Sequence, residues 1–302
     1  MLLKGDCMVG MATLGENSID AVVSDPPYEL NFMGNGWDRS GIAFNPEMWK
    51  LALRALKPGG YLLAFGGSRT IHRIAIAIED AGFIIEDSLH WTYGSGFPKS
   101  LNISKAIDSH FGLERKVIGQ RTTGIGTGGG VTSIMGDGNR DITEPASAEA
   151  WEWDGWGTAL KPSHEPVVVA RKPADCPLTP NDFTKIQFCS KPSVSEKDRG
   201  LGADFEAVIA GVGALQDNGR ARQPKKNIHP TVKPIEVMRR LVSLVTPEGG
   251  TVLDPFLGSG TTAVAATLER RNWVGCELTP DYWNIIEARV QWAADDVSGR
   301  LF

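Results

Sequence analysis

Residues 254–262 read Asp-Pro-Phe-Leu-Gly-Ser-Gly-Thr-Thr, and they connect an apolar run over residues 250–254 to a helical pattern over residues 261–271. Glycines between a strand and a helix let the backbone approach a ligand closely, and the helix N-terminus supplies amide donors. The next apolar run, residues 273–277, ends at Glu277, about 20 residues after the glycines, where dinucleotide-type folds place an acid on ribose hydroxyls. This order of strand, glycine turn, helix and acid predicts a site for a nucleoside-containing ligand.

The chemistry of the glycine turn narrows the choice of nucleoside. The turn lacks the three-glycine dinucleotide pattern, and Asp254 lies beside it. A carboxylate there would repel a pyrophosphate and attract a cationic amine or a sulfonium. S-adenosylmethionine carries both of these cations, whereas an NAD-dependent oxidoreductase is disfavoured by the short loop and by Asp254.

A second motif, Asp25-Pro26-Pro27-Tyr28, directly follows the apolar run 19–24. Two consecutive prolines favour a stiff, extended turn, and ligands of open α/β sheets bind beyond the carboxyl ends of the strands. The motif therefore suits a reaction that needs an acceptor oxygen next to an aromatic face. The alternative is a plain strand-ending turn with an exposed tyrosine.

Strand and helix patterns alternate at both ends of the chain and are interrupted in the middle. Alternation of this kind predicts a parallel sheet with right-handed crossovers. Residues 119–139 are rich in glycine, threonine and serine, and residues 173–226 are irregular, with a weak helical pattern over residues 204–212. We expect strands at residues 1–4, 19–24, 61–65, 83–93, 165–171, 250–254 and 273–277, and helices at residues 46–56, 70–81, 234–245, 261–271 and 282–292.

Together, Asp25-Pro26-Pro27-Tyr28 and Phe256-Leu257-Gly258-Ser259-Gly260 resemble the motifs of the amino-methyltransferase family of DNA enzymes, which methylate N6 of adenine or N4 of cytosine. The segment His229-Pro230-Thr231-Val232-Lys233-Pro234 and the pair Gly5-Asp6 are similar to two further family motifs. The motif that resembles the family's catalytic one comes first, and this order resembles the family's β group, a circular permutation of the fold.

The resemblance implies an α/β fold with a Rossmann-like seven-stranded methyltransferase sheet, circularly permuted and carrying an inserted target-recognition region. Residues 1–112 would form the catalytic half, and residues 229–302 the cofactor-binding half. Residues 113–228 would form the insertion, with a returning core strand near residues 164–171.

The resemblance also implies S-adenosyl-L-methionine as cofactor and double-stranded DNA as substrate. The Asp25 carboxylate and the Pro26 carbonyl would accept hydrogen bonds from the target amino group, and Tyr28 would stack on a flipped-out base. The implied catalytic residues are Asp25, Pro26, Pro27 and Tyr28. The implied cofactor-binding residues are Asp6, Asp25, Lys233, Asp254, Phe256, Gly258, Ser259, Gly260, Thr261 and Glu277.

Adenine is the favoured target because Asp at the first position of the family's catalytic motif is typical of N6-adenine enzymes, whereas Ser is typical of N4-cytosine enzymes. N4-cytosine methylation is the main alternative. A non-catalytic cofactor-binding module and an RNA or protein methyltransferase are less favoured, since the acidic motif is intact. Carbon-5 cytosine chemistry is disfavoured because the chain has no Pro-Cys pair.

Candidate DNA contacts are the basic cluster Arg220, Arg222, Lys225 and Lys226, which could neutralise phosphates or be a solvated linker. A loop containing Asn35, Trp37 and Asp38 is a candidate to close over the base. Trp151, Trp153 and Trp156 could wedge into DNA, although packing of the insertion onto the main domain is the favoured interpretation.

The rest of the composition adds few constraints. The 302 residues carry a net charge of −5, which argues against an indiscriminate nucleic-acid coat protein but not against a local basic face. Neither the four cysteines nor the histidines have metal-ligand spacing, so we expect no metal and reduced thiols. Neither a secretion signal nor a bilayer-length apolar run is evident, so we expect a cytoplasmic protein; a homodimer is possible.

Overall fold

The computed structural model describes residues 1–30, 40–94, 102–121, 140–158, 163–174, 186–202, 205 and 226–299. The chain divides into two compact units, which are described separately. The first unit comprises Met1–Thr92, His164–Gly211 and Gln223–Phe302. The second unit comprises Tyr93–Ser163 and Val212–Arg222.

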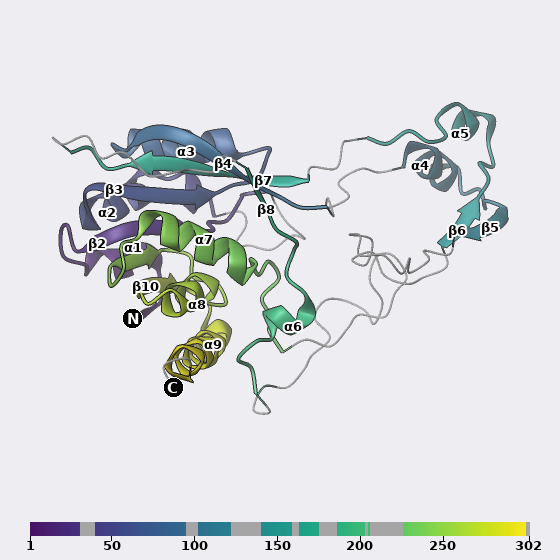
Figure 1. Cartoon of the computed structure of the whole chain (residues 1–302). Coiled ribbons are helices and arrows are strands. Elements are labelled where there is room, and N and C mark those ends of the chain that lie inside the picture. The colour runs from purple at the N-terminus through teal and green to yellow at the C-terminus, as the bar shows by residue number, and fades with distance from the viewer. Residues whose placement is uncertain are drawn as a thin grey trace. The chain divides into compact units, whose positions relative to one another are not determined.

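A mostly parallel sheet forms the centre of the first unit (Figure 1). The order of its eight strands is β1-β10-β9-β2-β3-β7-β4-β8. Their bounds are β1 Leu2–Lys4, β2 Ile19–Ser24, β3 Leu56–Phe65, β4 Ile84–Thr92, β7 His164–Arg171, β8 Ile186–Phe188, β9 Thr251–Asp254 and β10 Asn272–Glu277. The predicted seven-stranded methyltransferase sheet is confirmed, and the short β8 extends it beside β4.

One strand departs from the expected parallel sheet. β7 pairs antiparallel with both β3 and β4, with Phe65 opposite Val167 and Trp91 opposite Glu165. Antiparallel neighbours can be joined without a crossover, so the chain can leave the sheet after β4 and re-enter it at the same edge. The reversal matters for function because it places the start of β7, rather than its end, among the carboxyl ends of the parallel strands.

Helices cover both faces of the sheet. On one face, α1 (Cys7–Ala12), α2 (Pro46–Ala55) and α3 (Ile71–Asp80) bury Val22, Leu62 and Val168. Side chains alternate between the faces of a strand, and Phe65 and Val167 line a cavity on the other face together with residues of α7 (Ile235–Val245). Helices α8 (Thr261–Leu268) and α9 (Pro280–Gly299) pack with α7. Every helix expected outside residues 204–212 is present, and α1 is an additional helix that the sequence analysis did not predict. The weak helical pattern over residues 204–212 lies outside the described residues, except for residue 205.

Both ends of the chain contribute to the same edge of the sheet. β1 pairs in parallel with β10, so that Leu2 lies opposite Gly275 and Lys4 opposite Glu277. The backbone amide of Gly275 also donates to the carbonyl of Met1. This pairing of the first strand with the last is what the circular permutation predicts.

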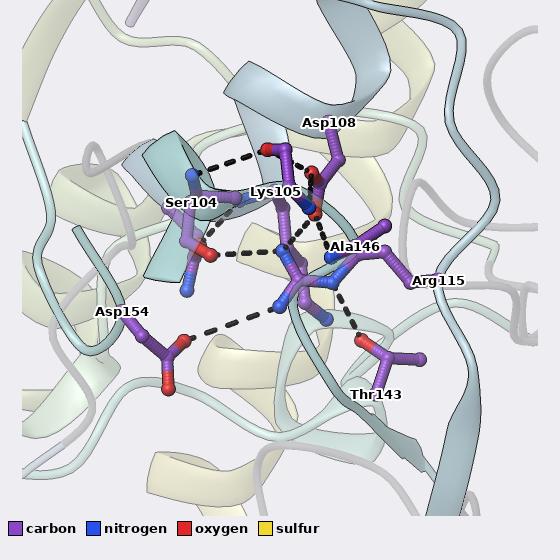
Figure 2. A network of polar contacts seen from close by, with 10 residues as sticks. Ser104, Lys105, Asp108, Arg115, Thr143, Ala146 and Asp154 are labelled. Atoms are coloured by element: carbon purple, nitrogen blue, oxygen red, sulfur yellow. Dashed lines mark hydrogen bonds and ion pairs between the residues drawn. The ribbon is translucent and has the colours of Figure 1, made fainter. Parts of the chain in front are cut away.

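The second unit contains α4 (Ile103–His110), α5 (Ala148–Glu152) and the antiparallel pair β5 (Val117–Arg121) and β6 (Arg140–Thr143). A buried carboxylate, Asp108, holds it together: it accepts hydrogen bonds from Arg115, from the Ala146 amide and from the Ser147 amide and hydroxyl (Figure 2). Burial alone would raise the pKa of Asp108, but these donors lower it below its usual value.

The three tryptophans of the second unit are largely exposed. The exposed fractions of Trp151, Trp153 and Trp156 are 54%, 44% and 63%. The rings of Trp153 and Trp156 pack edge to face, with 6.1 Å between their centroids. Both their packing onto the main domain and their role as a DNA wedge stay predictions.

Candidate active site

The two motifs of the sequence meet at the carboxyl ends of adjacent strands. β2 ends at Ser24 and β9 ends at Asp254, and these parallel strands are neighbours in the sheet. The Ser24 hydroxyl donates to Asp254 Oδ1 at 2.7 Å. The Asp25 motif and the glycine turn therefore lie at one rim of the sheet.

Asp25 has one occupied and one unpartnered carboxylate oxygen. Its Oδ2 accepts a hydrogen bond from Lys233 Nζ at 2.6 Å. Its Oδ1 is buried and has no hydrogen-bond partner among the described residues. Burial raises the pKa of Asp25, while the charge of Lys233 opposes the increase. A buried acceptor without a donor costs free energy unless a ligand supplies the donor.

Lys233 is shared between two carboxylates. Besides Asp25, its ammonium contacts Glu165 Oε2 at 3.3 Å. It also lies over the rings of Tyr28 and Phe65, 5.2 and 5.1 Å from their centroids. Burial opposes the charge of Lys233, but the two carboxylates raise its pKa above the usual value. The side chain predicted to bind cofactor is thus engaged with the carboxylate of Asp25.

Tyr28 is held at both ends. Its hydroxyl donates to Glu165 Oε2 at 2.8 Å, and its carbonyl accepts from the Thr70 hydroxyl at 2.7 Å. Burial, followed by the charges of Asp25 and Glu165, raises the pKa of Tyr28 well above 10. The phenol therefore stays protonated and can act as a donor across the physiological pH range.

The glycine turn forms a tight cradle. The Gly258 amide donates to Glu277 Oε2 at 2.8 Å. Gly258 has φ +56°, and a Cβ there would lie 2.8 Å from Nε2 of His229. Gly260, with φ +85°, caps the N-terminus of α8. Both positions favour glycine, because side chains rarely adopt these positive φ values. A turn without side chains at these positions lets a ligand approach the peptide groups closely.

Asp254 accepts three hydrogen bonds at the base of this turn. Oδ1 receives the Ser24 hydroxyl and the Phe256 amide, and Oδ2 receives the Thr262 hydroxyl at 2.5 Å. Burial raises the pKa of Asp254 to about 6 in spite of these donors. Asp254 therefore fixes the turn and carries negative charge beneath it at neutral pH.

Two further acids lie at or just beyond the carboxyl ends of β10 and β1. Glu277 accepts the amides of Gly258 and Thr279, and burial raises its pKa. Asp6 is exposed and caps α1 by accepting the amides of Met8 and Val9. The Gly5 amide donates to the Glu277 carbonyl, and Asp6 is the next residue of the chain. Asp6 therefore lies near the end of β10, where Glu277 is located.

A family model described as DNA methylase matches residues 19–288. The chain belongs to this family. The Type II methyltransferase M.HindIII of Haemophilus influenzae is 25% identical to it over 96% of the chain and 94% of the relative's length. Another Haemophilus influenzae protein, the Type II methyltransferase M.HinfI, is 22% identical over 96% of the chain and 68% of the relative's length.

Solved structures share the fold. The complex of M1.HpyAVI with S-adenosylmethionine superposes with a TM-score of 0.53 at 19% identity, covering 96% of this chain and 99% of the other. The cytosine-N4-specific PvuII DNA methyltransferase superposes with a TM-score of 0.57 at 16% identity, covering 99% and 91%. The protein is a DNA methyltransferase whose cofactor is S-adenosyl-L-methionine.

Several predicted residues of this methyltransferase have other contacts or lie outside the described residues. The ammonium of Lys226 donates to the carbonyls of Leu201 and Gly202, so it is engaged within the first unit. The hydroxyls of Ser259 and Thr261 accept from a buried arginine, and Phe256 packs against the core. The structure does not describe Arg220, Arg222, Lys225, Asn35, Trp37 or Asp38.

The sequence interpretation missed two polar residues of this site. Glu165 begins a strand that otherwise reads as apolar, and Arg289 interrupts the buried face of α9 after Ile285 and Ile286. A charged residue at an apolar position of a periodic pattern is the signal that could have identified each of them.

The described residues contain no group of three or more His, Cys, Asp and Glu side chains placed to hold a metal ion. Among them, every helix is too short or too polar to cross a bilayer.

Proposed function

We propose that this methyltransferase transfers a methyl group to the exocyclic N6 of an adenine flipped out of double-stranded DNA. The observation that carries the proposal is the buried Oδ1 of Asp25, an acceptor without a donor beside the glycine cradle. An amino group with two hydrogens is a ligand that can supply this donor.

The reaction requires the amine to be oriented, because its lone pair is delocalised into the base. Asp25 Oδ1 and the Pro26 carbonyl accept the two amino hydrogens and direct the lone pair away from the ring. S-adenosylmethionine supplies an activated methyl on a sulfonium. As the N–C bond forms, the S–CH3 bond of the sulfonium would break and neutral S-adenosylhomocysteine would leave. The Asp25 carboxylate would stabilise the positive charge that develops on the nitrogen, and loss of one amino proton to solvent would remove that charge. In-line positioning of donor and acceptor supplies much of the rate.

Lys233 keeps Asp25 ionised for this purpose. The ammonium binds Oδ2 and leaves Oδ1 available, so one carboxylate both retains its charge and presents an acceptor. Without that cation, burial would favour the protonated acid, which accepts weakly.

Tyr28 provides the stacking face for the base. Extruding a base costs a few kcal/mol, and stacking on an aromatic ring returns about 1–3 kcal/mol. Glu165 and Thr70 hold the tyrosine at its hydroxyl and its carbonyl, so less conformational entropy is lost when the base binds.

The preference for adenine rests on which residue occupies the first position of the motif. Asp in that position resembles the N6-adenine enzymes, and Ser resembles the N4-cytosine enzymes. Ser24 precedes Asp25, but its hydroxyl is buried and bonded to Asp254. This contact favours Asp25 as the residue that meets the base.

The remaining assignments complete the proposal. Glu277 binds the ribose hydroxyls of the cofactor and Asp6 lies near its adenine. Arg220, Arg222 and Lys225 contact phosphates, whereas the ammonium of Lys226 is taken up by two backbone carbonyls and is left out of the proposal. Cytoplasmic location and a homodimer stay predictions.

Nucleoside analysis tests the proposed target. The protein is incubated with unmethylated DNA and tritium-labelled cofactor, and the digested nucleosides are separated. We expect label in N6-methyl-2′-deoxyadenosine. Label in N4-methylcytosine would overturn the choice of base, and label only in added RNA or protein would overturn the choice of substrate.

A further inference from the structure

Arg289 is a buried cation directly behind the glycine turn. It lies on α9 and is 0% exposed. Its Nη1 donates to the Ser259 carbonyl at 2.6 Å and contacts the hydroxyls of Ser259 and Thr261 at 3.0 and 3.2 Å. All three acceptors belong to the turn or to the first residue of α8.

Stability alone does not explain this arrangement. Nε and Nη2 of Arg289 are buried and have no hydrogen-bond partner among the described residues. Burial lowers the pKa of Arg289 to about 10. A buried cation with unmet donors costs free energy, and an apolar side chain of similar volume is often as stabilising or more so.

Arg289 and one backbone hydrogen bond together hold the Ser259–Gly260 peptide: its carbonyl accepts from Arg289, and its amide donates to the Leu257 carbonyl at 2.8 Å. The Ser259–Gly260 peptide precedes a residue with φ +85° and directly joins the cradle to α8. Because Arg289 holds the Ser259 carbonyl from behind, rotation of this peptide breaks a charged hydrogen bond. This contact therefore restrains the backbone conformation of the turn.

The segment after α6 (Val194–Lys197) supports Arg289 from the other side. Gly200 has φ +86°, and a Cβ there would lie 2.9 Å from the Arg289 Cα. The Arg199 guanidinium lies 5.5 Å from the ring centroid of Trp292 on α9. Glu196, within α6, accepts the Ile235 amide at the start of α7 at 2.9 Å. These residues of the expected insertion thus pack behind the cofactor turn.

We propose that Arg289 is a positioning residue for S-adenosylmethionine: it fixes the Ser259–Gly260 peptide so that the glycine turn is ordered before the cofactor binds. The proposal concerns cofactor binding and is independent of which base is methylated. The free energy that is lost by burying the guanidinium is then offset by tighter binding of the cofactor, as expected for a preorganised site.

Two measurements on the same variant test the proposal. In Arg289→Met, we expect the Tm of the cofactor-free protein to be unchanged or higher. We expect the Kd for S-adenosylmethionine, measured by calorimetry without DNA, to increase by about tenfold or more, as for loss of a hydrogen bond to a charged group. Arg289→Lys should restore part of the affinity, since an ammonium can still bond the Ser259 carbonyl.

Arg239→Met is the matched control. Arg239 bonds Glu269 at 2.6 Å and contacts no residue of the glycine turn in the described structure, so its loss should leave the Kd within twofold. The proposal is overturned if Arg289→Met lowers Tm while the Kd stays within twofold of the wild type. If Arg289→Met does not fold, Arg289→Gln decides, because it removes the cation and keeps a polar side chain: a Kd for S-adenosylmethionine within twofold of the wild type would overturn the proposal equally.

Discussion

The hydroxyl of Tyr28 donates to Glu165 Oε2 at 2.8 Å, joining residues 137 positions apart. Tyr28 follows the parallel strand β2, and Glu165 lies at the beginning of the antiparallel strand β7. The reversed direction of β7 is what brings an acid to the tyrosine proposed to hold the target base. The same acid contacts Lys233, so Glu165 and Asp25 share one cation.

Replacing Glu165 should impair the DNA step and spare the cofactor. In Glu165→Gln, the Tyr28 hydroxyl loses a charged acceptor and Lys233 loses one of its two carboxylates. We expect kcat/KM for DNA to fall by about 10- to 100-fold, the range for one hydrogen bond to a charged group. The Kd for S-adenosylmethionine should be unchanged.

Tyr28→Phe is the control, since it removes only the hydroxyl and retains the ring. Because the two residues share one hydrogen bond, the double variant should be little worse than Glu165→Gln alone. Fully additive losses would show that Glu165 does not act through Tyr28.

Replacing Lys233 should alter the pH dependence of the reaction. The ammonium opposes the burial-driven rise in the pKa of Asp25, so Lys233→Met should raise that pKa further. The carboxylate must be ionised to act, and the acid limb of the kcat/KM profile should therefore move to higher pH. Activity at pH 7 should fall by about 100-fold or more.

Lys57→Met is the matched control, because Lys57 pairs with Asp20 at a half-exposed site on β3. It should leave the profile unchanged. An unshifted acid limb in Lys233→Met would refute the role assigned to Lys233.

Asp254 should make cofactor binding depend on pH. Its pKa of about 6 means that the ionised form is lost as pH falls through 6. The Kd for S-adenosylmethionine should therefore increase by about tenfold between pH 7 and pH 5. S-adenosylhomocysteine lacks the sulfonium charge, so its Kd should change less; equal changes for both ligands would argue against attraction between Asp254 and the sulfonium.

The raised pKa of Asp254 also makes the stability of the folded protein depend on pH. The direction is opposite to that of cofactor binding, since stability decreases as pH rises. A raised pKa means that Asp254 favours the folded state most below its unfolded pKa, and this contribution is lost as pH rises through about 6. Asp254→Asn, which cannot ionise, should retain or exceed the wild-type Tm at pH 8 while weakening S-adenosylmethionine binding. A lower Tm at pH 8 together with unchanged binding would contradict the account.

The sequence predicts the parts of this site that lie next to one another in the chain. Strand, glycine turn and helix around Gly258 follow from local patterns, as does the position of Asp25 beyond β2, because hydrophobic periodicity and turn chemistry are local properties. Contacts such as Glu165 with Tyr28 depend on strand order and direction. The direction of β7 follows from where the chain re-enters the sheet, which periodicity does not encode.

The sequence also does not predict which side chains form hydrogen bonds with one another. Lys233 was expected at the cofactor, yet it bonds the Asp25 carboxylate. The sequence interpretation gave Arg289 no role, although its position on the apolar face of the helical pattern was a signal of burial. Only the packed structure shows that it is buried behind the turn.

The most direct test of the account separates methyl transfer from cofactor binding in one variant, Asp25→Ala. The account places Asp25 Oδ1 on the target amine, so transfer to DNA should fall by at least about 1000-fold, while the Kd for S-adenosylmethionine, measured without DNA, stays within a few-fold of the wild type. Substantial remaining transfer, or loss of transfer and cofactor binding together, would contradict it.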